Sequence, residues 1–309
     1  MKRRTLKKAY FVTIAVTFLI GLILGTFIEK EYGVEALRTA VRTNDWTILQ
    51  PQTTGISDGN IPDDYQGKLQ LFILAGQSNM SGLGELPPSE METHPQIYVF
   101  GNDYLWKRAK EPVDDPKNQV DNVSLDTDAA FGPSVSFATT VLKQRPDMVL
   151  GLIPCAKGGA SIQDWQKKLS DNTLYGSCLK RVRAASVMGT VAGFLFLQGE
   201  IDTLDPKEAP ERTFLPNRWA DEFAALVRDW RSDLNLPDLP VVFAQIGTNA
   251  DPDRFKNWAI VKEQQRQVRL PSTSMITTDD LALKDYVHFT TESYQTIGQR
   301  FAKAYLDLL

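Results

Sequence analysis

Residues 71–82 read LFILAGQSNMSG, an apolar run that stops at a glycine and continues into small and polar side chains. A continuous apolar run is typical of a strand that is buried on both faces of a parallel sheet. Serine and asparagine are common where such a strand ends in a turn, and most such serines only bond the nearby backbone. Ser78 is therefore a candidate nucleophile only if the rest of the chain supplies a base, an orienting acid and donors for a developing negative charge.

Short apolar runs alternate with helical segments from Lys68 onward. The predicted strands are 69–75, 148–154, 192–198 and 240–247, and the predicted helices are 133–144, 177–188, 218–230, 261–270 and 291–309. This alternation predicts an α/β fold, with a mostly parallel central sheet and helices on both faces. Functional groups in such sheets collect at the carboxyl ends of the strands. All four predicted strands end in polar, glycine-rich sequence, namely AGQSNM, PCAKGGASIQDW, LQGEID and AQIGTN.

The search for a base is narrow because the chain contains only two histidines. His94 directly precedes a proline in a predicted loop, where a solvent-exposed histidine is the default. His288 stands at the entry to the last predicted helix, three residues after Asp285. This spacing lets a carboxylate and an imidazole on one loop point into the same site, where the acid holds the ring tautomer and stabilises the imidazolium.

Four sequence blocks, GQSNMSG, KGGASIQDW, LQGEID and DYVHFT, occur in this order. Together they resemble the sialate O-acetylesterase type of carbohydrate esterase, within the wider SGNH hydrolases. The resemblance implies a flavodoxin-like three-layer α/β/α sandwich for residues 67–309. It also implies that Ser78 is the nucleophile, that His288 is the base and that Asp285 orients the base.

The same resemblance places the oxyanion hole at the backbone N–H groups of Ser78 and Gly159 and the side-chain amide of Gln198. Attack on an ester carbonyl creates an alkoxide, which donors fixed before the reaction stabilise in a dry pocket. Glycine suits the second position, because a side chain there would obstruct close approach of the backbone to a ligand.

Four further residues of these blocks are candidates for binding substrate, namely Gln77, Asn79, Trp165 and Glu200. Two alternatives stay open among them. Glu200, like its neighbour Asp202, could instead brace a loop by accepting backbone N–H groups, as buried carboxylates after a strand often do. Trp165 either lines the sugar site or packs in the core.

The N-terminal region predicts an uncleaved membrane anchor. Residues 1–8 form a basic flank with five positive charges, and residues 9–28 carry no charge and are long enough to span the membrane as a helix. The flank predicts a cytoplasmic N-terminus, residues 29–66 a stalk, and residues 67–309 an extracytoplasmic domain. Secretion after signal cleavage is the alternative, but the run lacks the small-residue cleavage site of a signal peptide.

Charge and cysteine content exclude several kinds of partner. All five basic residues of the flank precede the anchor. The rest of the chain therefore contains 29 Lys and Arg and 38 Asp and Glu, which gives it a net charge of −9. Such an acidic domain lacks the clustered positive footprint of nucleic-acid binding. No metal-ligand spacing is present, and we expect neither a metal nor another cofactor. Cys155 and Cys178 are expected to be two buried thiols, with a disulfide bridge as the alternative.

The sequence leaves three hypotheses for function. The first is a membrane-anchored serine esterase that removes acetyl groups from O-acetylated carbohydrate. The second is a lipase-like or thioesterase-like hydrolase on the same fold, which a long apolar lid would favour. The third is a catalytically silent carbohydrate-binding or envelope protein, since a fold does not fix a function.

Overall fold

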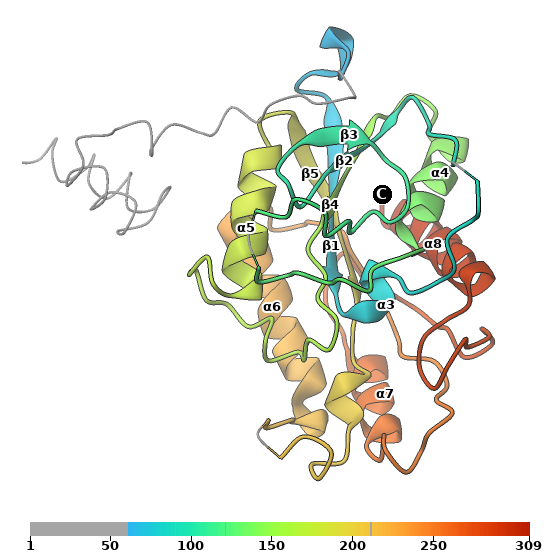
Figure 1. Ribbon diagram of the computed structural model, residues 1–309. Helices are drawn as coiled ribbons and strands as arrows, with labels where there is room; N and C mark the ends of the chain where they lie inside the picture. The colour runs from blue at the N-terminus through green and yellow to red at the C-terminus, as the bar shows by residue number, and fades with distance from the viewer. Residues whose placement is uncertain (1–60, 90, 121, 211) are drawn as a thin grey trace, which may run out of the picture. The chain divides into compact units, whose positions relative to one another are not determined.

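The computed structural model describes residues 61–309, except residues 90, 121 and 211 (Figure 1). The predicted flank, anchor and most of the stalk lie outside the described residues. Within the residues that are described, no helix has both the length and the apolar character needed to cross a membrane.

A seven-stranded sheet forms the centre of the domain. In sequence order its strands are β1 (Leu69–Gly76), β2 (Ile97–Phe100), β3 (Trp106–Arg108), β4 (Leu150–Pro154), β5 (Gly189–Leu197), β6 (Val241–Ala244) and β7 (Thr273–Ile276). Their spatial order is β3-β2-β4-β1-β5-β6-β7, and only the pairing of β3 with β2 is antiparallel. The run β4-β1-β5-β6-β7 has the 2-1-3-4-5 strand order of flavodoxin-like folds.

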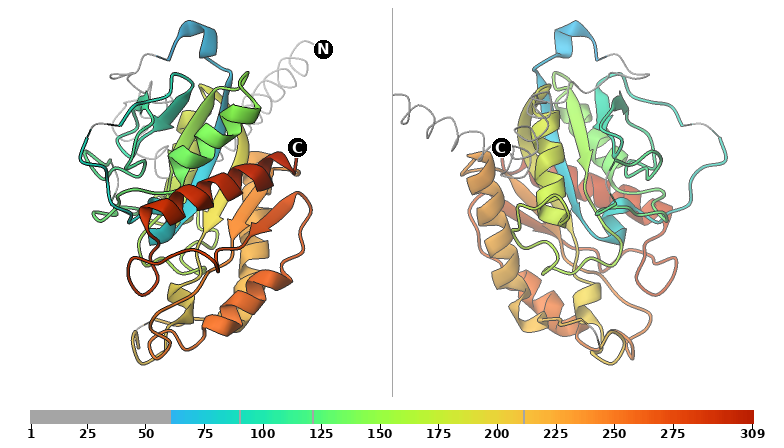
Figure 2. Two further views of the ribbon diagram at one scale, coloured as in Figure 1. Left: turned by 90° about the vertical axis from the view of Figure 1, so that its right-hand side faces the viewer. Right: turned by 60° about the vertical axis from the view of Figure 1, so that its left-hand side comes forward.

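Helices cover both faces of this sheet (Figures 1 and 2). Apolar side chains of α5 (Leu174–Ala185), α6 (Trp219–Leu234) and α7 (Trp258–Gln267) pack in the core on one face. Those of α4 (Ser134–Gln144) and α8 (Thr291–Leu306) pack in the core on the other. Short helical turns complete the fold, namely α3 (Ser78–Ser81), η2 (Asp63–Tyr65), η3 (Ile201–Thr203) and η4 (Pro216–Arg218).

The predicted α/β class and mostly parallel sheet are confirmed. The sequence analysis missed three strands, β2, β3 and β7, which are short and lie toward the edges of the sheet. In β7 only the last of four residues is buried, so the strand has no continuous apolar run to reveal it. A short strand at a sheet edge buries little surface, so neighbouring strands decide its conformation more than its own sequence does.

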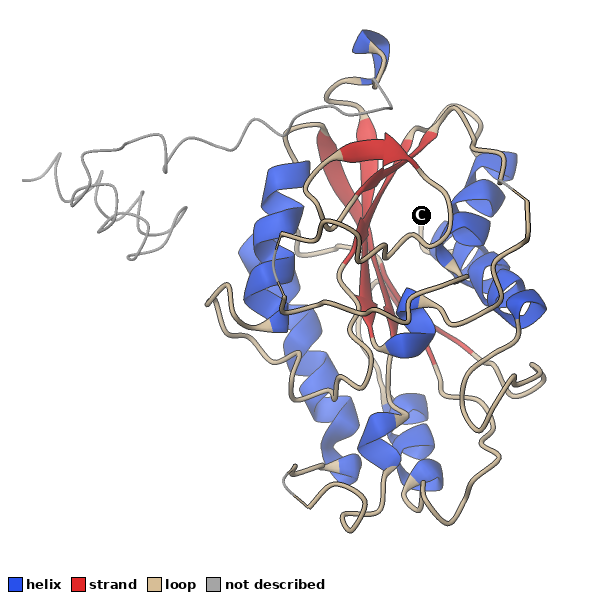
Figure 3. Ribbon diagram, viewed as in Figure 1, coloured by secondary structure: helices blue, strands red, loops and turns tan. Residues whose placement is uncertain are grey.

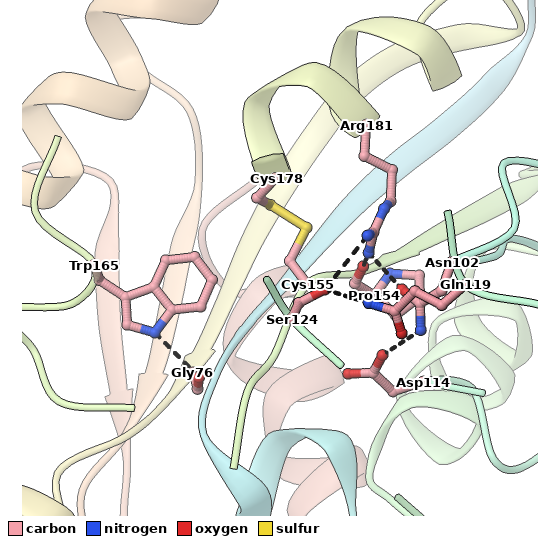
Figure 4. The surroundings of a disulfide bond; sticks show 10 residues. All are labelled: Gly76, Asn102, Asp114, Gln119, Ser124, Pro154, Cys155, Trp165, Cys178 and Arg181. Atoms are coloured by element: carbon pink, nitrogen blue, oxygen red, sulfur yellow. Dashed lines mark hydrogen bonds between the residues drawn. A yellow bond between two sulfur atoms is a disulfide. The ribbon is translucent and has the colours of Figure 1, made fainter. Parts of the chain in front are cut away.

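The expectation of two free thiols is wrong, because Cys155 and Cys178 form a disulfide (Figure 4). Cys155 directly follows β4 and Cys178 lies in α5, with their Cα atoms 5.5 Å apart. One turn further along α5, the fully buried Arg181 donates hydrogen bonds to the carbonyl of Pro154 and to the side chain of Asn102. The bridge and the arginine together tie the carboxyl end of β4 to α5.

The strand order reverses direction between β1 and β5, and this reversal marks the expected ligand-binding edge of the sheet. From β1 the chain moves to β2 and β4 on one side, whereas from β5 it moves to β6 and β7 on the other. Where the loops after two adjacent strands run in opposite directions, they diverge from each other. Ligands of open α/β sheets bind between such loops. The turn after β1, with α3, lies at this edge, which is the lower one in Figure 3.

Candidate active site

Ser78 occupies a tight turn between β1 and α3. Gly76 makes this turn possible: its φ is +141°, and a Cβ there would lie 2.1 Å from the carbonyl oxygen of Leu197 on β5. No residue with a side chain fits such a close approach of two backbones. Ser78 is then the first residue of α3, and it is 8% exposed at the carboxyl end of β1.

His288 contacts Ser78 and lies in a loop 210 residues further along the chain. Its Nε2 lies 2.9 Å from Ser78 Oγ, and its Nδ1 lies 2.7 Å from Oδ2 of Asp285. The loop is closed by a hydrogen bond from the N–H of Lys284 to the carbonyl of His288, and Thr290 caps α8 directly after it. The structure therefore brings together all three predicted triad residues, in the order serine, imidazole, carboxylate.

Asp285 is arranged to stay ionised. Burial raises its pKa, but the N–H groups of His288 and Val287, at 2.8 and 2.9 Å from Oδ1, and the imidazole outweigh this effect. The pKa of Asp285 thus lies below its usual value. Donors that favour the charged carboxylate keep it available to orient the ring and to stabilise an imidazolium.

The predicted oxyanion glycine lies in a turn that other side chains hold. Gly159 has a φ of +70°, and a Cβ there would meet no atom within 4 Å, so the position faces open space. Oδ2 of Asp126 accepts the N–H of Gly158 at 2.8 Å, and Arg212 donates to the carbonyl of Gly159 at 3.0 Å. Throughout the described chain, neither the N–H of Ser78 nor that of Gly159 has a hydrogen-bond partner. Both remain able to donate to a developing oxyanion.

Gln198 has a different position from the one that the resemblance implies. Its side chain is fully buried, and Trp219 fixes the amide by donating to Oε1 at 2.9 Å. The two hydrogens of Nε2 are surrounded by three protein acceptors, Asp202 Oδ2 at 2.5 Å, Ala160 O at 3.1 Å and Gln77 Oε1 at 3.3 Å. This geometry leaves no amide hydrogen for an oxyanion, and Gln198 instead joins the turns that follow β1, β4 and β5.

Asn79 joins the nucleophile turn to the histidine loop from inside the protein. Its Nδ2 donates to Glu200 Oε1 at 2.6 Å and to the carbonyl of Val287 at 3.1 Å, and its Oδ1 accepts the hydroxyl of Tyr294 at 2.6 Å. Every hydrogen-bonding group of this buried amide is used. Asn79 therefore has no amide group left to bind substrate. Its contacts instead fix the backbone on either side of the Ser78–His288 pair.

The remaining candidates for substrate binding are also buried. Trp165 is fully buried and donates from Nε1 to the carbonyl of Gly76, so the geometry supports the packing alternative (Figure 4). Gln77 accepts the N–H groups of Gly199 and Ile201 at 3.4 Å each. Glu200 braces Asn79, as described above. These side chains form the support of the site rather than its open surface.

His94 lies at the opposite edge of the sheet from Ser78. Its carbonyl accepts the N–H of Ile97, the first residue of β2, which runs parallel to β1 by way of β4. His94 is therefore not a base for Ser78. No group of three or more metal-ligating side chains that could hold an ion occurs in residues 61–309 as described.

Several residues of the site carried no signal in the sequence. Asp126, Arg212 and Tyr294 come from three loops or helices with no motif around them, and each acts only through a contact with a distant segment. A single sequence does not show such pairings.

Comparison with known proteins identifies the family of the chain. The family profile described as carbohydrate esterase, sialic acid-specific acetylesterase, matches residues 68–307. A probable carbohydrate esterase of Arabidopsis thaliana is 30% identical over 259 residues, covering 77% of this chain and 90% of the relative. A crystal structure of an Arabidopsis thaliana protein superposes with a TM-score of 0.64 at 29% identity, covering 78% of this chain and 98% of that one.

Two more distant structures share the fold. A carbohydrate acetylesterase from Xanthomonas citri has a TM-score of 0.56 at 21% identity, covering 77% of this chain and 56% of that one. NanS has a TM-score of 0.55 at 16% identity, covering 78% of this chain and 98% of that one. The chain thus belongs to the sialic acid-specific acetylesterase family of carbohydrate esterases, and it is a carboxylic ester hydrolase.

Proposed function

We propose that this esterase removes O-acetyl groups from carbohydrate by a double displacement through an acetyl-Ser78 intermediate. The observation that carries the proposal is the hydrogen-bonded chain Ser78 Oγ, His288 Nε2, His288 Nδ1, Asp285 Oδ2, with separations of 2.9 and 2.7 Å. These three residues lie at the carboxyl edge of the sheet, where ligands of open α/β sheets bind.

In the first half of the reaction, His288 Nε2 takes the hydroxyl proton of Ser78 as Oγ attacks the acetyl carbonyl carbon. Asp285 holds the ring with Nδ1–H donating and stabilises the imidazolium that forms. The N–H groups of Ser78 and Gly159 donate to the oxyanion. When the tetrahedral intermediate collapses, the sugar oxygen leaves with the proton from Nε2, and the acetyl group stays on Ser78.

In the second half, water replaces the sugar. His288 takes a proton from the water, whose oxygen attacks the acetyl carbonyl, and the same two N–H groups stabilise the second oxyanion. Collapse returns the proton to Ser78 Oγ and releases acetic acid, which ionises in solution. One ester and one water thus give one free sugar hydroxyl and one acetic acid.

The variant Ser78→Ala tests this proposal in the full-length chain purified in detergent. Loss of a triad nucleophile should lower turnover of a small aryl acetate about a millionfold. Ser232→Ala, at an exposed position on α6, is the matched control and should behave as wild type. Retention of even a tenth of the activity by Ser78→Ala would mean that another residue is the nucleophile.

The choice of esters distinguishes the alternatives. Faster hydrolysis of acetylated polysaccharide and aryl acetate than of a long-chain aryl ester supports the acetylesterase. The reverse order supports a lipase-like enzyme, and absence of hydrolysis of every ester supports a silent protein.

We further propose that residues 9–28 anchor the enzyme in a membrane, with the catalytic domain on the extracytoplasmic side. The charge-free run and the basic flank support the anchor and its orientation. The Cys155–Cys178 disulfide supports the compartment, because disulfides persist in oxidising environments.

A phosphatase that is active only after export, fused behind Leu309, tests the orientation in a bacterial host. We expect an active, membrane-associated fusion, and an inactive one when residues 2–28 are deleted. An inactive full-length fusion would place the domain in the cytoplasm, and activity released into the medium would favour the cleaved alternative.

A further inference from the structure

One buried carboxylate contacts both halves of the proposed oxyanion hole. Oδ2 of Asp126 accepts the hydroxyl of Ser81 at 2.8 Å and the N–H of Gly158 at 2.8 Å. Ser81 is the last residue of α3, the short helix that begins at Ser78, and Gly158 directly precedes Gly159. Because one oxygen atom accepts both donors, Asp126 joins the helix of the nucleophile to the turn of the oxyanion glycine.

The turn of the oxyanion glycine needs such a contact, because it lacks side chains of its own. Gly158 and Gly159 are consecutive, and glycine has more backbone freedom than any other residue. The direction of the Gly159 N–H therefore depends on contacts to the groups on either side of it. Asp126 holds the N–H of Gly158 before it, and Arg212 donates to the carbonyl of Gly159 after it, at 3.0 Å. The donor peptide is thus fixed on both sides.

The backbone around Asp126 is itself bonded to both of these segments. Lys157 donates from Nζ to the carbonyl of Leu125 at 2.6 Å. The N–H of Ala130 donates to the carbonyl of Gly82, the residue that follows α3, at 2.7 Å. Asp126 is also buried. A carboxylate that is held in this way has little freedom to move, so it can set the positions of the groups that it contacts.

We propose that Asp126 is a positioning residue that fixes the two oxyanion donors, the N–H groups of Ser78 and Gly159, relative to each other. It acts through Ser81 and Gly158 rather than by contact with substrate. Donors stabilise an oxyanion most when they are aimed at it before the reaction. A displacement of about 1 Å in such a site can lower the rate about a hundredfold. This inference rests on the proposed function and concerns the geometry of its oxyanion hole.

The variant Asp126→Ala removes both bonds and tests the proposal in the full-length chain purified in detergent. For a small aryl acetate, kcat per folded molecule should fall about tenfold to a hundredfold, with KM changed by less than about threefold. The Ki of trifluoroacetone should rise by the same factor, because its adduct with Ser78 carries an oxyanion where the transition state does. A loss of stability alone would change neither quantity once folded fraction is measured by circular dichroism.

Further variants separate the two bonds from the charge. Asp126→Asn keeps an oxygen that can accept both bonds, and its kcat should stay within about threefold of the wild type. Ser81→Ala removes only the bond to α3 and should lower kcat about threefold to tenfold. The double variant Ser81→Ala/Asp126→Ala should be no slower than Asp126→Ala, since both changes break the same link. Asp128→Ala, at an exposed position in the same loop, is the matched control and should behave as wild type.

The possible outcomes separate this inference from the proposed function. If Asp126→Ala keeps kcat per folded molecule within about threefold of the wild type, or if its defect lies wholly in KM, the inference is overturned and the esterase proposal stays intact. A fall in kcat with an unchanged Ki of trifluoroacetone, or an equal loss in Asp126→Asn, also overturns it. If Asp126→Ala does not fold, unchanged kcat and Ki in Ser81→Ala overturn it. A wild type that hydrolyses no acetyl ester overturns the proposed function itself.

Discussion

The loop that carries His288 and the turn that follows β5 both supply carboxylates to the site, but their surroundings shift the pKa values of these carboxylates in opposite directions. Asp285 in the loop keeps 34% of its side chain exposed, accepts two N–H groups and the imidazole, and has a lowered pKa. Glu200 and Asp202 in the turn are almost completely buried, and burial raises the pKa of both, to about 7 for Asp202. Each also has one buried oxygen without a partner among the described residues.

This difference indicates which of these carboxylates is suited to partner His288 in the proposed mechanism. All three acids are close to the site, so proximity does not decide. Solvent and N–H donors stabilise a charge on Asp285, whereas the interior around Glu200 and Asp202 favours the neutral form. A carboxyl whose neutral form is favoured holds loops together but stabilises an imidazolium less than an ionised carboxylate does.

Among changes to these carboxylates, Asp285→Asn should have the largest effect. Loss of the charge and of the correct ring tautomer should lower kcat by about a thousandfold to ten-thousandfold, with the fold retained. Steady-state kinetics, corrected for folded fraction by circular dichroism, measures the effect. Asp280→Asn makes the same chemical change at an exposed ion pair with Arg300 and should leave kcat unchanged. If Asp285→Asn lowered kcat by less than about tenfold, the charge of Asp285 would matter no more to His288 than the carboxyls of the turn after β5 do.

The same change in the turn after β5 should have a small effect. Glu200→Gln keeps an oxygen for Asn79 and replaces a carboxyl that burial already holds toward its neutral form, so kcat should change by less than about threefold. Glu200→Ala is the contrasting variant. It leaves Asn79 without its acceptor and should lower the free energy of unfolding by about 1–3 kcal/mol. A loss of kcat in Glu200→Gln as large as that of Asp285→Asn would show that both carboxylates act on His288 as charges.

The smallest effect is on the pH dependence of stability, and it has opposite signs in the two regions. Asp202 keeps its proton in the folded chain up to about pH 7, whereas the unfolded chain loses it near 3.8. The free energy of unfolding should therefore fall as pH rises between these values. Asp285, with its lowered pKa, stabilises the fold at neutral pH and loses this contribution as pH falls below about 4.

Chemical denaturation at several pH values measures both slopes. Asp202→Asn should reduce the loss of stability between pH 5 and 7 by about 1–3 kcal/mol, since one pKa unit corresponds to about 1.4 kcal/mol. Glu111 and Asp114, whose pKa values burial raises to about 8 and about 7, contribute with Glu200 to the slope that remains. Asp285→Asn should change the slope only in the acid range. An unchanged slope in Asp202→Asn between pH 5 and 7 would show that its carboxyl is ionised in the folded protein.

Much of the site could be predicted from local sequence. The serine follows a strand that is apolar along nearly its whole length, and His288 was found by elimination, because the other histidine directly precedes a proline in a predicted loop. The role of Gln198 could not be found in this way. Its block matches the family, but Trp219 and Asp202, which fix its amide, are paired with it only in the folded chain.

By itself, the sequence determined the α/β class, the polar strand ends and the identity of the serine, imidazole and carboxylate, because these depend on apolar periodicity and on residue types that the chain offers rarely. The tertiary structure alone decided how the pKa of each acid is shifted, whether Cys155 and Cys178 pair, and which groups hold the amide of Gln198. The physical reason is that solvation, hydrogen bonding and ion pairing depend on every group within a few ångströms, and most of those groups are distant in sequence.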